Sequence, residues 1–297
     1  MSGLTDRDLP GLFEAADAAS LDGQRRYVRA VRLRLVLAVA AAATGVWPLI
    51  VGRVDLAAIG TAIALAGVTA TELNLKSSRP EDRWYDGRAL AESAKSLAWK
   101  FAVGGSPFAK TGRVRDPQAA EREFIKQVGE LLAEAPTTAI TPSDRPVVTD
   151  AMRLLRSQDL DTRKEVYLRS RIEDQQDYYT RRAKRNERRA GWWRTALLAI
   201  EVAGIGAALA KAVGAITIDL AGVVAAVIAA GTAWMSLRQL STLARAYTFA
   251  ANELGIVRGR LALVEDEAAW AAEVADAEDA VSREHTMWRA SRTRPAG

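Results

Sequence analysis

The chain has 297 residues, of which 49% are hydrophobic and 26% are charged, and these two groups gather in separate stretches. It contains no cysteine, which excludes disulfides, thiolate nucleophiles and cysteine-ligated zinc or iron–sulfur sites. A single histidine leaves almost no material for a histidine metal cluster or a Ser–His–Asp triad. We therefore expect no enzyme, and no catalytic, metal or cofactor site.

Residues 1–24 are polar and are predicted to form an N-terminal cytoplasmic segment. The first apolar run starts near Leu35, too late for a cleavable signal peptide. Apolar segments follow in two pairs, and we predict membrane helices at about 35–52 and 56–73, and at about 193–211 and 220–237. Roughly 18 helical residues span ~27 Å, close to the hydrocarbon thickness of a bilayer.

The links within each pair are short, so each pair should form an antiparallel hairpin. The two hairpins lie far apart in the sequence and indicate an internal duplication. The predicted fold is thus an all-α integral membrane protein with two two-helix transmembrane hairpins and long cytoplasmic helices. The alternative is a soluble helical protein with four buried helices, but charge clusters on one side of all four segments argue against it.

Basic residues gather at one end of every apolar segment, while the two turns carry only Arg53 and Lys211, with Asp55 and Asp219 beside them. This positive-inside asymmetry predicts that both termini are cytoplasmic. It also explains the net charge of +5 without nucleic acid, because juxtamembrane arginines contact anionic headgroups. The clusters are Arg25, Arg26, Arg29, Arg32 and Arg34; Lys76, Arg79, Arg83 and Arg88; Arg181, Arg182, Lys184, Arg185, Arg188, Arg189 and Arg194; and Arg238 and Arg245.

Glu201 is the one ionisable residue well inside an apolar segment. A carboxylate at that depth is costly and normally faces a bundle interior or a water-filled path. Glu201, with Lys211 and Asp219 at the turn, is therefore a candidate pore or gating group. The alternative is a protonated Glu201 that hydrogen-bonds to a neighbouring helix.

Small residues at four-residue spacing let membrane helices approach closely. Gly222, Ala226 and Ala230 form such a ladder in the fourth apolar segment and are predicted to pack helices together. An alanine-rich composition alone also produces matches of this kind.

The remaining sequence predicts cytoplasmic helices and a linker over 109–160, a charged helix over 161–190 and a coiled coil over 243–278. The coiled-coil seam follows alternating steps of four and three residues. Its partner is either the 161–190 helix of the same chain or the same helix of another subunit. As an oligomer seam its main residues are Leu243, Tyr247, Leu254, Val257, Leu261 and Val264.

The stretch after the second apolar segment resembles the SMODS- and SLOG-associating two-transmembrane effector (SLATT) domains. In that family a two-helix hairpin precedes a cytoplasmic helix with an Arg…Ala-Glu…Lys…Trp pattern. The first copy would cover about 25–108 and the second about 161–290. The second copy keeps the architecture but lacks the Lys and the Trp, so its assignment rests on position. The residues that carry the resemblance are Trp84, Tyr85, Arg88, Glu92, Lys95 and Trp99.

The resemblance implies a bacterial inner-membrane effector of a conflict or anti-phage immune system, which opens pores or disrupts the membrane when a sensor is triggered. No nucleotide-binding motif is visible, so the sensor would be a separate protein. The first hypothesis is therefore a homo-oligomeric pore-forming effector whose partners are the lipid bilayer and its own copies. The alternative is a membrane-anchored scaffold or signalling adaptor that acts through its cytoplasmic coiled coil. An ion-pair row is the default interpretation of Arg88, Glu92 and Lys95.

Overall fold

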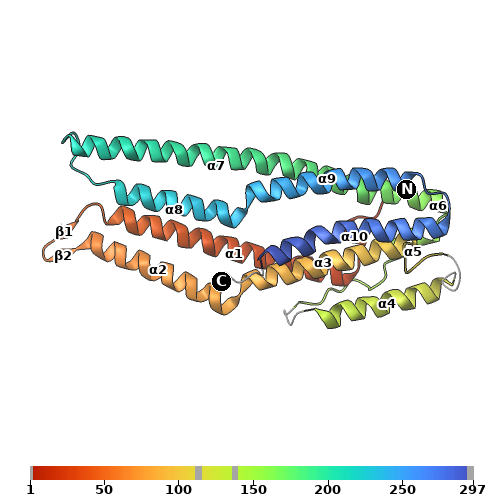
Figure 1. Ribbon diagram of the computed structural model, residues 1–297. Coiled ribbons are helices and arrows are strands. Elements are labelled where there is room, and N and C mark those ends of the chain that lie inside the picture. Colours follow the sequence, from red (N-terminus) through yellow and green to blue (C-terminus); the bar gives the residue numbers. More distant parts are fainter. Residues whose placement is uncertain (1–2, 111–115, 136–139, 293–297) are drawn as a thin grey trace. The chain divides into compact units, whose positions relative to one another are not determined.

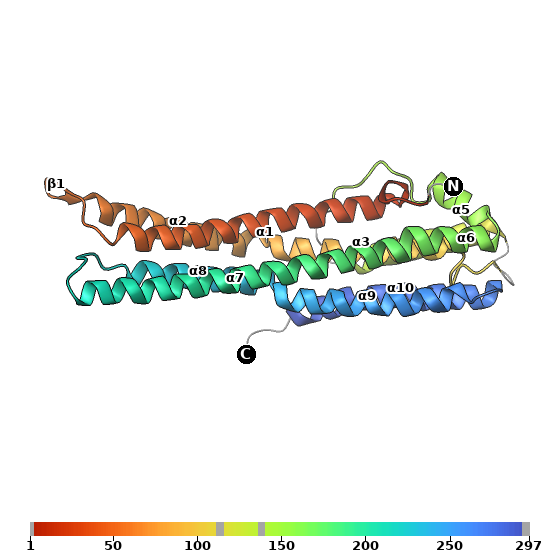
Figure 2. The ribbon, with the colours of Figure 1, turned by 90° about the horizontal axis from the view of Figure 1, so that it is seen from above.

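The structure is a computed structural model that describes residues 3–110, 116–135 and 140–292, with the side chains of 282–292 left undescribed. The described chain is helical apart from one small β-hairpin, which confirms the all-α class (Figures 1 and 2). In chain order the elements are η1 (Asp6–Asp8), α1 (Gly11–Thr44), β1 (Ile50–Val51), β2 (Val54–Asp55), α2 (Leu56–Ser78), α3 (Pro80–Val103), α4 (Pro117–Glu134), α5 (Asp150–Ser157), α6 (Leu160–Tyr167), the π-helical turn η3 (Leu168–Glu173), α7 (Asp174–Ala212), α8 (Ala221–Arg238), α9 (Leu240–Ala262) and α10 (Glu267–Arg292).

The chain divides into two compact units. The hairpin unit consists of Arg25–Pro80 and Ala183–Arg245 and contains all the predicted membrane segments. The polar unit consists of the described parts of Met1–Gln24, Glu81–Arg182 and Ala246–Gly297. Segments from both ends and from the middle of the sequence therefore build the polar unit.

Within the part of the chain that the structure describes, three helical stretches are long and apolar enough to cross a membrane: Leu56–Val103, Leu160–Ala212 and Ala221–Ala262. The predicted first membrane helix, at about 35–52, is too long, because α1 ends at Thr44. Gly45 follows directly, and Pro48 disfavours a helical conformation for the residue before it. Only about ten residues of α1 therefore continue beyond Arg34, and an extended loop covers the rest of that stretch.

The loop of the first hairpin ends in a tight two-stranded turn. Strand β1 pairs antiparallel with β2, with Val51 opposite Val54, and Gly52 has the positive φ of 64° that such a turn requires. Asp55 Oδ1 then accepts backbone N–H groups of Leu49 at 3.1 Å and Ala57 at 2.9 Å. Asp55 thus closes the turn and caps α2 in one step.

Glycines mark the close approaches inside each hairpin. In the first, a Cβ added to Gly67 would lie 2.9 Å from Leu37 Cδ1. In the second, a Cβ on Gly204 would lie 2.6 Å from Val224 Cγ1. Close packing at small residues is what holds membrane helices together, since lipid supplies no hydrophobic drive.

The predicted single coiled coil over 243–278 is wrong in one respect, because the helix breaks after Ala262. Asp266 starts a new helix by accepting the N–H groups of Ala268 and Ala269, and α10 returns antiparallel along α9 (Figure 2). The stripe itself is real: Leu254, Val257 and Leu261 are buried in one core with residues of α10. Leu243, Tyr247 and Val264 are half-buried.

The junctions that follow α2 and α8 are alike. Arg79, between α2 and α3, and Gln239, between α8 and α9, both adopt the left-handed conformation, with φ of 39° and 45°. Each donates its N–H to the carbonyl four residues earlier, and a new helix starts at once. Non-glycine residues rarely adopt this conformation, so the repeated joint is a specific feature of the duplicated architecture.

The core of the polar unit is aromatic. Trp99 of α3 lies 5.7 Å from Tyr167 of α6, and Tyr167 lies 5.8 Å from Trp270 of α10, between ring centroids. The indole N–H of Trp270 donates to the Val103 carbonyl at 2.8 Å, so it is not left unpaired in the core. Aromatic side chains of α3, α6 and α10 therefore meet in this core.

Candidate functional site

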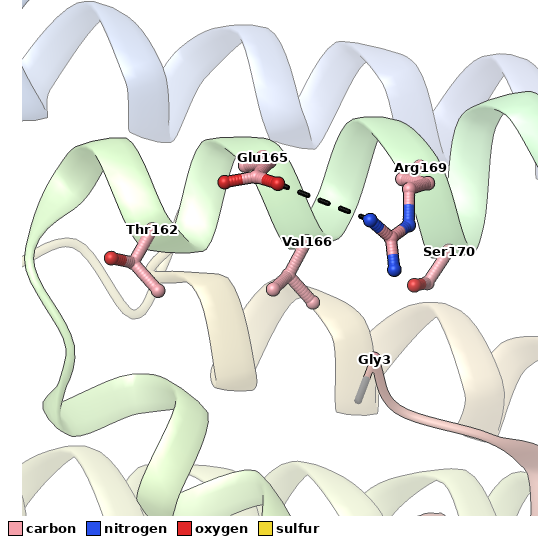
Figure 3. Close-up of a pocket in the computed structure, with 6 residues that line it drawn as sticks. All are labelled: Gly3, Thr162, Glu165, Val166, Arg169 and Ser170. Carbon is pink, nitrogen blue, oxygen red and sulfur yellow. Dashed lines mark ion pairs between the residues drawn. The ribbon is translucent and has the colours of Figure 1, made fainter. Parts of the chain in front are cut away.

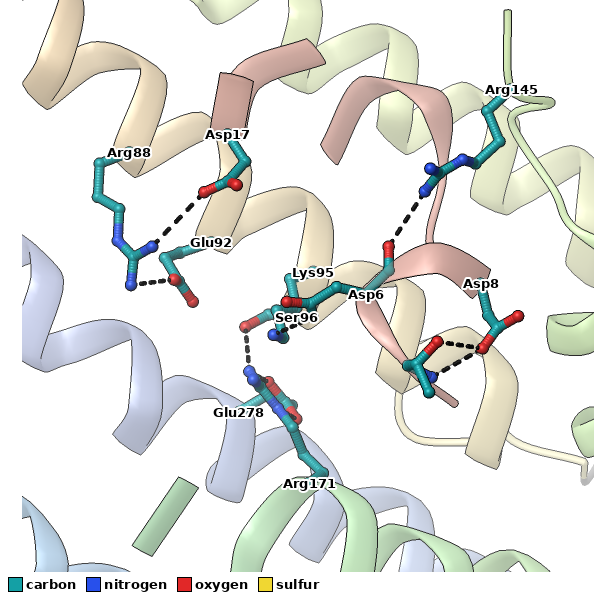
Figure 4. Close-up of polar contacts among 11 residues, drawn as sticks. Asp6, Asp8, Asp17, Arg88, Glu92, Lys95, Ser96, Arg145, Arg171 and Glu278 are labelled. Atoms are coloured by element: carbon teal, nitrogen blue, oxygen red, sulfur yellow. Dashed lines mark hydrogen bonds and ion pairs between the residues drawn. The ribbon is translucent and has the colours of Figure 1, made fainter. Parts of the chain in front are cut away.

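The residues that carry the family resemblance all lie on α3, and they split between two roles. Trp99 is 2% exposed and packs in the aromatic core. Trp84 and Tyr85 stack on each other at 4.9 Å between centroids, and the Trp84 carbonyl accepts the Ser20 hydroxyl of α1 at 3.0 Å. The three charged members instead form a polar network with the N-terminal part of the chain (Figure 4).

Arg88 is the first centre of this network. Its guanidinium pairs with Glu92 at 2.6 Å, one helical turn on, and reaches Asp17 of α1 at 3.8 Å. Burial acts to lower the pKa of Arg88, but the charges of Glu92 and Asp17 outweigh it and raise that pKa. Burial, helped by the nearby Asp6 and Glu92, raises the pKa of the Asp17 carboxyl even though Arg88 lies beside it. Arg88 therefore lies between two carboxylates, Asp17 and Glu92, and its charge offsets the repulsion between them.

Lys95 is the second centre. Its ammonium pairs with Asp6 of η1 at 2.6 Å and lies 5.5 Å from the centroid of the Phe13 ring. Arg145 donates to the Asp6 carbonyl at 3.1 Å, which holds the same short turn from the other side (Figure 4). The ion-pair row of α3 thus anchors the N-terminal segment, a role that spacing within the helix does not reveal.

A buried pair that the sequence analysis missed lies behind this row. Arg171 and Glu278 are 2% and 0% exposed, and two guanidinium nitrogens donate to the two carboxylate oxygens at 2.9 and 2.7 Å. Tyr167 donates its hydroxyl to the same carboxylate at 2.9 Å. Burial and the Glu278 charge raise the pKa of Tyr167, which keeps it a neutral donor.

The π-helical turn places Arg171 for this contact. Wide turns of this kind add one residue to a helix and are frequent at functional sites. Arg171 Nη2 also lies 3.5 Å from Ser96 Oγ of α3, so the buried pair connects η3, α10 and α3 (Figure 4). The sequence carried no clear signal for this pair, because Glu278 is one of several acids in α10 and its partner is distant in the sequence.

The polar network has the chemistry of a structural clamp. Its ionisable groups pair with one another, and no group of three or more acidic or histidine side chains among the described residues is arranged to hold a metal ion. A pocket of about 230 Å³ lies elsewhere, where Gly3 approaches α6 and η3 (Figure 3). Its charged lining is the exposed pair Glu165–Arg169, 4.0 Å apart, and it contains no member of the clamp.

Glu201, the candidate pore group, lies on α7 and is exposed. The inward-facing positions of α7 are Leu197 and Gly204, while Leu198, Val202 and Ile205 around Glu201 are all about three-fifths exposed. Glu201 forms no hydrogen bond or ion pair with any residue that the structure describes. It therefore points away from the interior of its own hairpin unit.

The other predicted residues of the hairpin unit are placed differently. Lys211 and Asp219 pair at 2.5 Å across the α7–α8 turn, and Asp219 also accepts the Ala221 N–H at 3.0 Å. Within the predicted ladder, Ala226 and Ala230 are half-buried but Gly222 is exposed with open space beside it. The tight contacts are at Gly204 and at Gly231, where a Cβ would lie 2.6 Å from Leu197 Cδ2.

Comparison with protein families gives two matches that together span most of the chain. Residues 10–164 match the SMODS and SLOG-associating 2TM effector domain 3, and residues 167–288 match the SMODS and SLOG-associating 2TM effector domain 1. The division between the two matches falls between residues 164 and 167, after the stretch of helices and linker predicted over 109–160, part of which lies outside the described residues. The first match includes Asp17, the partner of Arg88, but begins after Asp6, the partner of Lys95. The chain has no significant match among curated proteins or solved structures. The first match alone covers more than half of the chain, so the protein belongs to the SLATT family of membrane effector domains of conflict systems and carries two such domains in tandem.

Proposed function

We propose that this chain is a homo-oligomeric effector that opens a path for ions across the bacterial inner membrane. The observation that carries the proposal is the position of Glu201, on the outer apolar face of α7. A charged carboxylate that faces the hydrocarbon core costs free energy, about 2.5 kcal/mol or more on the lowest membrane-insertion scales. Contact with other copies, or with water that an assembly encloses, removes this cost.

The proposed topology places the polar unit and both termini in the cytoplasm. Exposed arginines precede the apolar segments, among them Arg29 and Arg32 of α1 and Arg185 and Arg188 of α7. At the opposite end the Lys211 charge is already matched by Asp219. This distribution follows the positive-inside rule.

A ring of Glu201 carboxylates, one from each copy, would favour cations, since rings of acidic side chains select them in channels. Neighbouring small side chains, Ala208 and Gly206, are exposed on the same helix and allow copies to approach. The trigger acts on the polar unit through a separate sensor protein. The clamp of Arg88, Lys95 and Arg171 gives that unit one defined arrangement from which it can be moved.

The experiment is a cation-flux measurement on the full chain in lipid vesicles, at a protein density high enough to drive assembly. The wild type should pass K⁺, and Glu201→Gln should change the flux at least several-fold. Glu187→Gln is the matched control, since Glu187 is an exposed acid on the same helix but lies among the juxtamembrane arginines. Its flux should equal that of the wild type.

Vesicles that stay tight to cations with the wild type inserted would contradict the pore and favour the scaffold or adaptor alternative. Equal fluxes for wild type and Glu201→Gln would remove Glu201 from the path. In cells, induction of the wild type should depolarise the membrane and induction of Glu201→Gln should do so less.

A further inference from the structure

Helix α9 and the turn that follows it have a second apolar stripe that the chain leaves uncovered. The first stripe, with Leu254, Val257 and Leu261, is buried in the polar unit. The second consists of Phe249, Ile256 and Leu263, which are 65%, 68% and 83% exposed. The spacing of seven residues puts Phe249 and Ile256 on one line along α9, and Leu263 follows in the turn directly after the helix ends at Ala262. We name these three residues the outer stripe.

We propose that the outer stripe pairs with the outer stripe of a second copy of this chain, as a parallel two-helix seam in the cytoplasm. This inference rests on the membrane topology of the proposed function and identifies a surface that would assemble the effector. It concerns the polar unit, whereas Glu201 belongs to the hairpin unit. The two surfaces can therefore be tested separately.

The parallel orientation follows from the chain connectivity. Helix α9 begins at Leu240, directly after α8 and its left-handed joint at Gln239. In two copies that share one membrane, both α9 helices start from the same surface. Equal residues then face each other in a parallel seam, so Phe249 meets Phe249 and Ile256 meets Ile256, as a seven-residue repeat requires.

The residues between and beside the outer stripe fit such a seam. Asn252 and Gly259 are exposed and lie three residues after Phe249 and Ile256, at the other positions that face the partner in a two-helix seam. Neither is charged, so the seam between Phe249 and Leu263 places no charged residue opposite the same residue of the second copy. A single asparagine inside a seam fixes register, because its amide finds a partner only when the two copies are aligned.

Membrane lipid is a less suitable occupant. The opposite face of α9 is fixed in the core of the polar unit. The outer stripe is one residue wide, whereas helices that lie in a membrane surface carry a broad apolar face.

The seam is short and therefore weak by itself. Three large side chains from each copy bury less area than the roughly 1,200 Å² of a stable protein interface. Confinement of both copies to one membrane raises their effective concentration and allows a weak seam to contribute to assembly.

The absence of native cysteine allows a direct test by cross-linking. Ile256→Cys is introduced into the full chain, and membranes are treated with a short bis-maleimide. We expect a covalent dimer with Ile256→Cys, and also with Phe249→Cys. Ala262→Cys, exposed on the same helix but off the seam, is the matched control and should give at least several-fold less dimer.

Ile205→Cys, near Glu201, reports on the hairpin unit in the same experiment. Dimer at position 205 with none at 249 and 256 would overturn the outer-stripe seam and leave the oligomeric effector intact. No dimer at any position would overturn both. A dimer that forms only between Phe249→Cys of one copy and Leu263→Cys of another would contradict the parallel orientation.

A charge placed in the seam provides the second test. Ile256→Asp should reduce the cross-linking of Phe249→Cys at least several-fold, since two carboxylates would face each other. Ala262→Asp adds the same charge off the seam and should leave cross-linking unchanged. Equal yields of the Phe249→Cys dimer from Ile256→Asp and Ala262→Asp would show that position 256 is not at a contact between copies.

Discussion

The polar unit and the hairpin unit both contain paired carboxylates, but the hairpin unit also contains Glu201, which differs from the rest. In the polar unit the fully buried Glu278 is paired with Arg171 and hydrogen-bonded to Tyr167. In the hairpin unit Glu72 of α2 forms an ion pair with Arg34 of α1, yet Glu201 of α7 faces outward without a partner among the described residues. A carboxylate that is paired within the chain stabilises the fold. A carboxylate without such a partner, like Glu201, is stabilised only by contacts from outside its own chain.

The largest expected effect comes from breaking the pair inside the polar unit. Arg171→Met would leave Glu278 buried and unpaired, which costs about 3–5 kcal/mol of unfolding free energy. Denaturant unfolding of the detergent-solubilised chain, followed by tryptophan fluorescence, measures this loss. Trp99 and Trp270 lie in the same core and report on it.

The double variant Arg171→Met with Glu278→Leu is the control, because it removes both charges together. It should recover most of the stability, since replacing a buried pair with apolar groups of similar size is often close to neutral. A double variant as unstable as the single one would mean that Glu278 has a further role beyond the pair.

A smaller effect is expected at the ion pair of the hairpin unit. Arg34→Gln leaves Glu72 next to apolar helix faces but about two-fifths exposed, so we expect a loss of about 1–2 kcal/mol. Lys76→Gln is the matched control, because Lys76 lies 3.8 Å from the same carboxylate and is 73% exposed. Its loss should stay within ~0.5 kcal/mol.

The comparison would be broken if Glu201→Gln lowered the unfolding free energy of the isolated chain as much as Arg34→Gln does. That result would show that Glu201 is matched within its own chain. The measurement is thermal unfolding of Glu201→Gln and Arg34→Gln in the same detergent, at a concentration where the chain is monomeric.

The smallest expected effect is the pH dependence that Asp17 contributes. Because the pKa of folded Asp17 is raised, the folded state binds the proton more tightly than the unfolded one. Asp17 therefore adds stability as the pH falls through its raised pKa, and this contribution is lost as the pH rises. Asp17→Asn should remove that slope.

The measurement is the difference in unfolding free energy between Asp17→Asn and wild type at pH 7 and at pH 4. The unfolding free energy of Asp17→Asn, relative to that of the wild type, should be higher at pH 7 than at pH 4. The difference should be less than about 1 kcal/mol, because Asp17 is only half-buried. Asp22→Asn is a control nearby on α1. A wild type that gains relative to Asp17→Asn at pH 7 would mean that Arg88 stabilises the charged carboxyl more than burial destabilises it.

Much of the fold followed from the sequence because its signals are strong ones. Four apolar stretches, two short turns and one-sided arginines gave the all-α class, and the motif from Trp84 to Trp99 gave the family. The end of α1 was missed because an uncharged run does not distinguish helix from loop. Gly45 and Pro48 carried that information.

The polar network was predictable only in part. Arg88 and Glu92 pair along one helix, and spacing shows such pairs. Lys95–Asp6 and Arg171–Glu278 join residues that are distant in sequence, and their pairing depends on how the helices are brought together. The α9 stripes show the same limit, since two heptad lines run along one helix and only the packing of α10 decides which of them is buried.

The joints at Arg79 and Gln239 have a mechanical consequence. Helices α1 and α7 run from the polar unit into the hairpin unit without a break, whereas the two return paths each pass through a left-handed residue that carries a cost of roughly 1–2 kcal/mol. Bending of each return path should therefore concentrate at its left-handed residue, because the residues on both sides of it are helical.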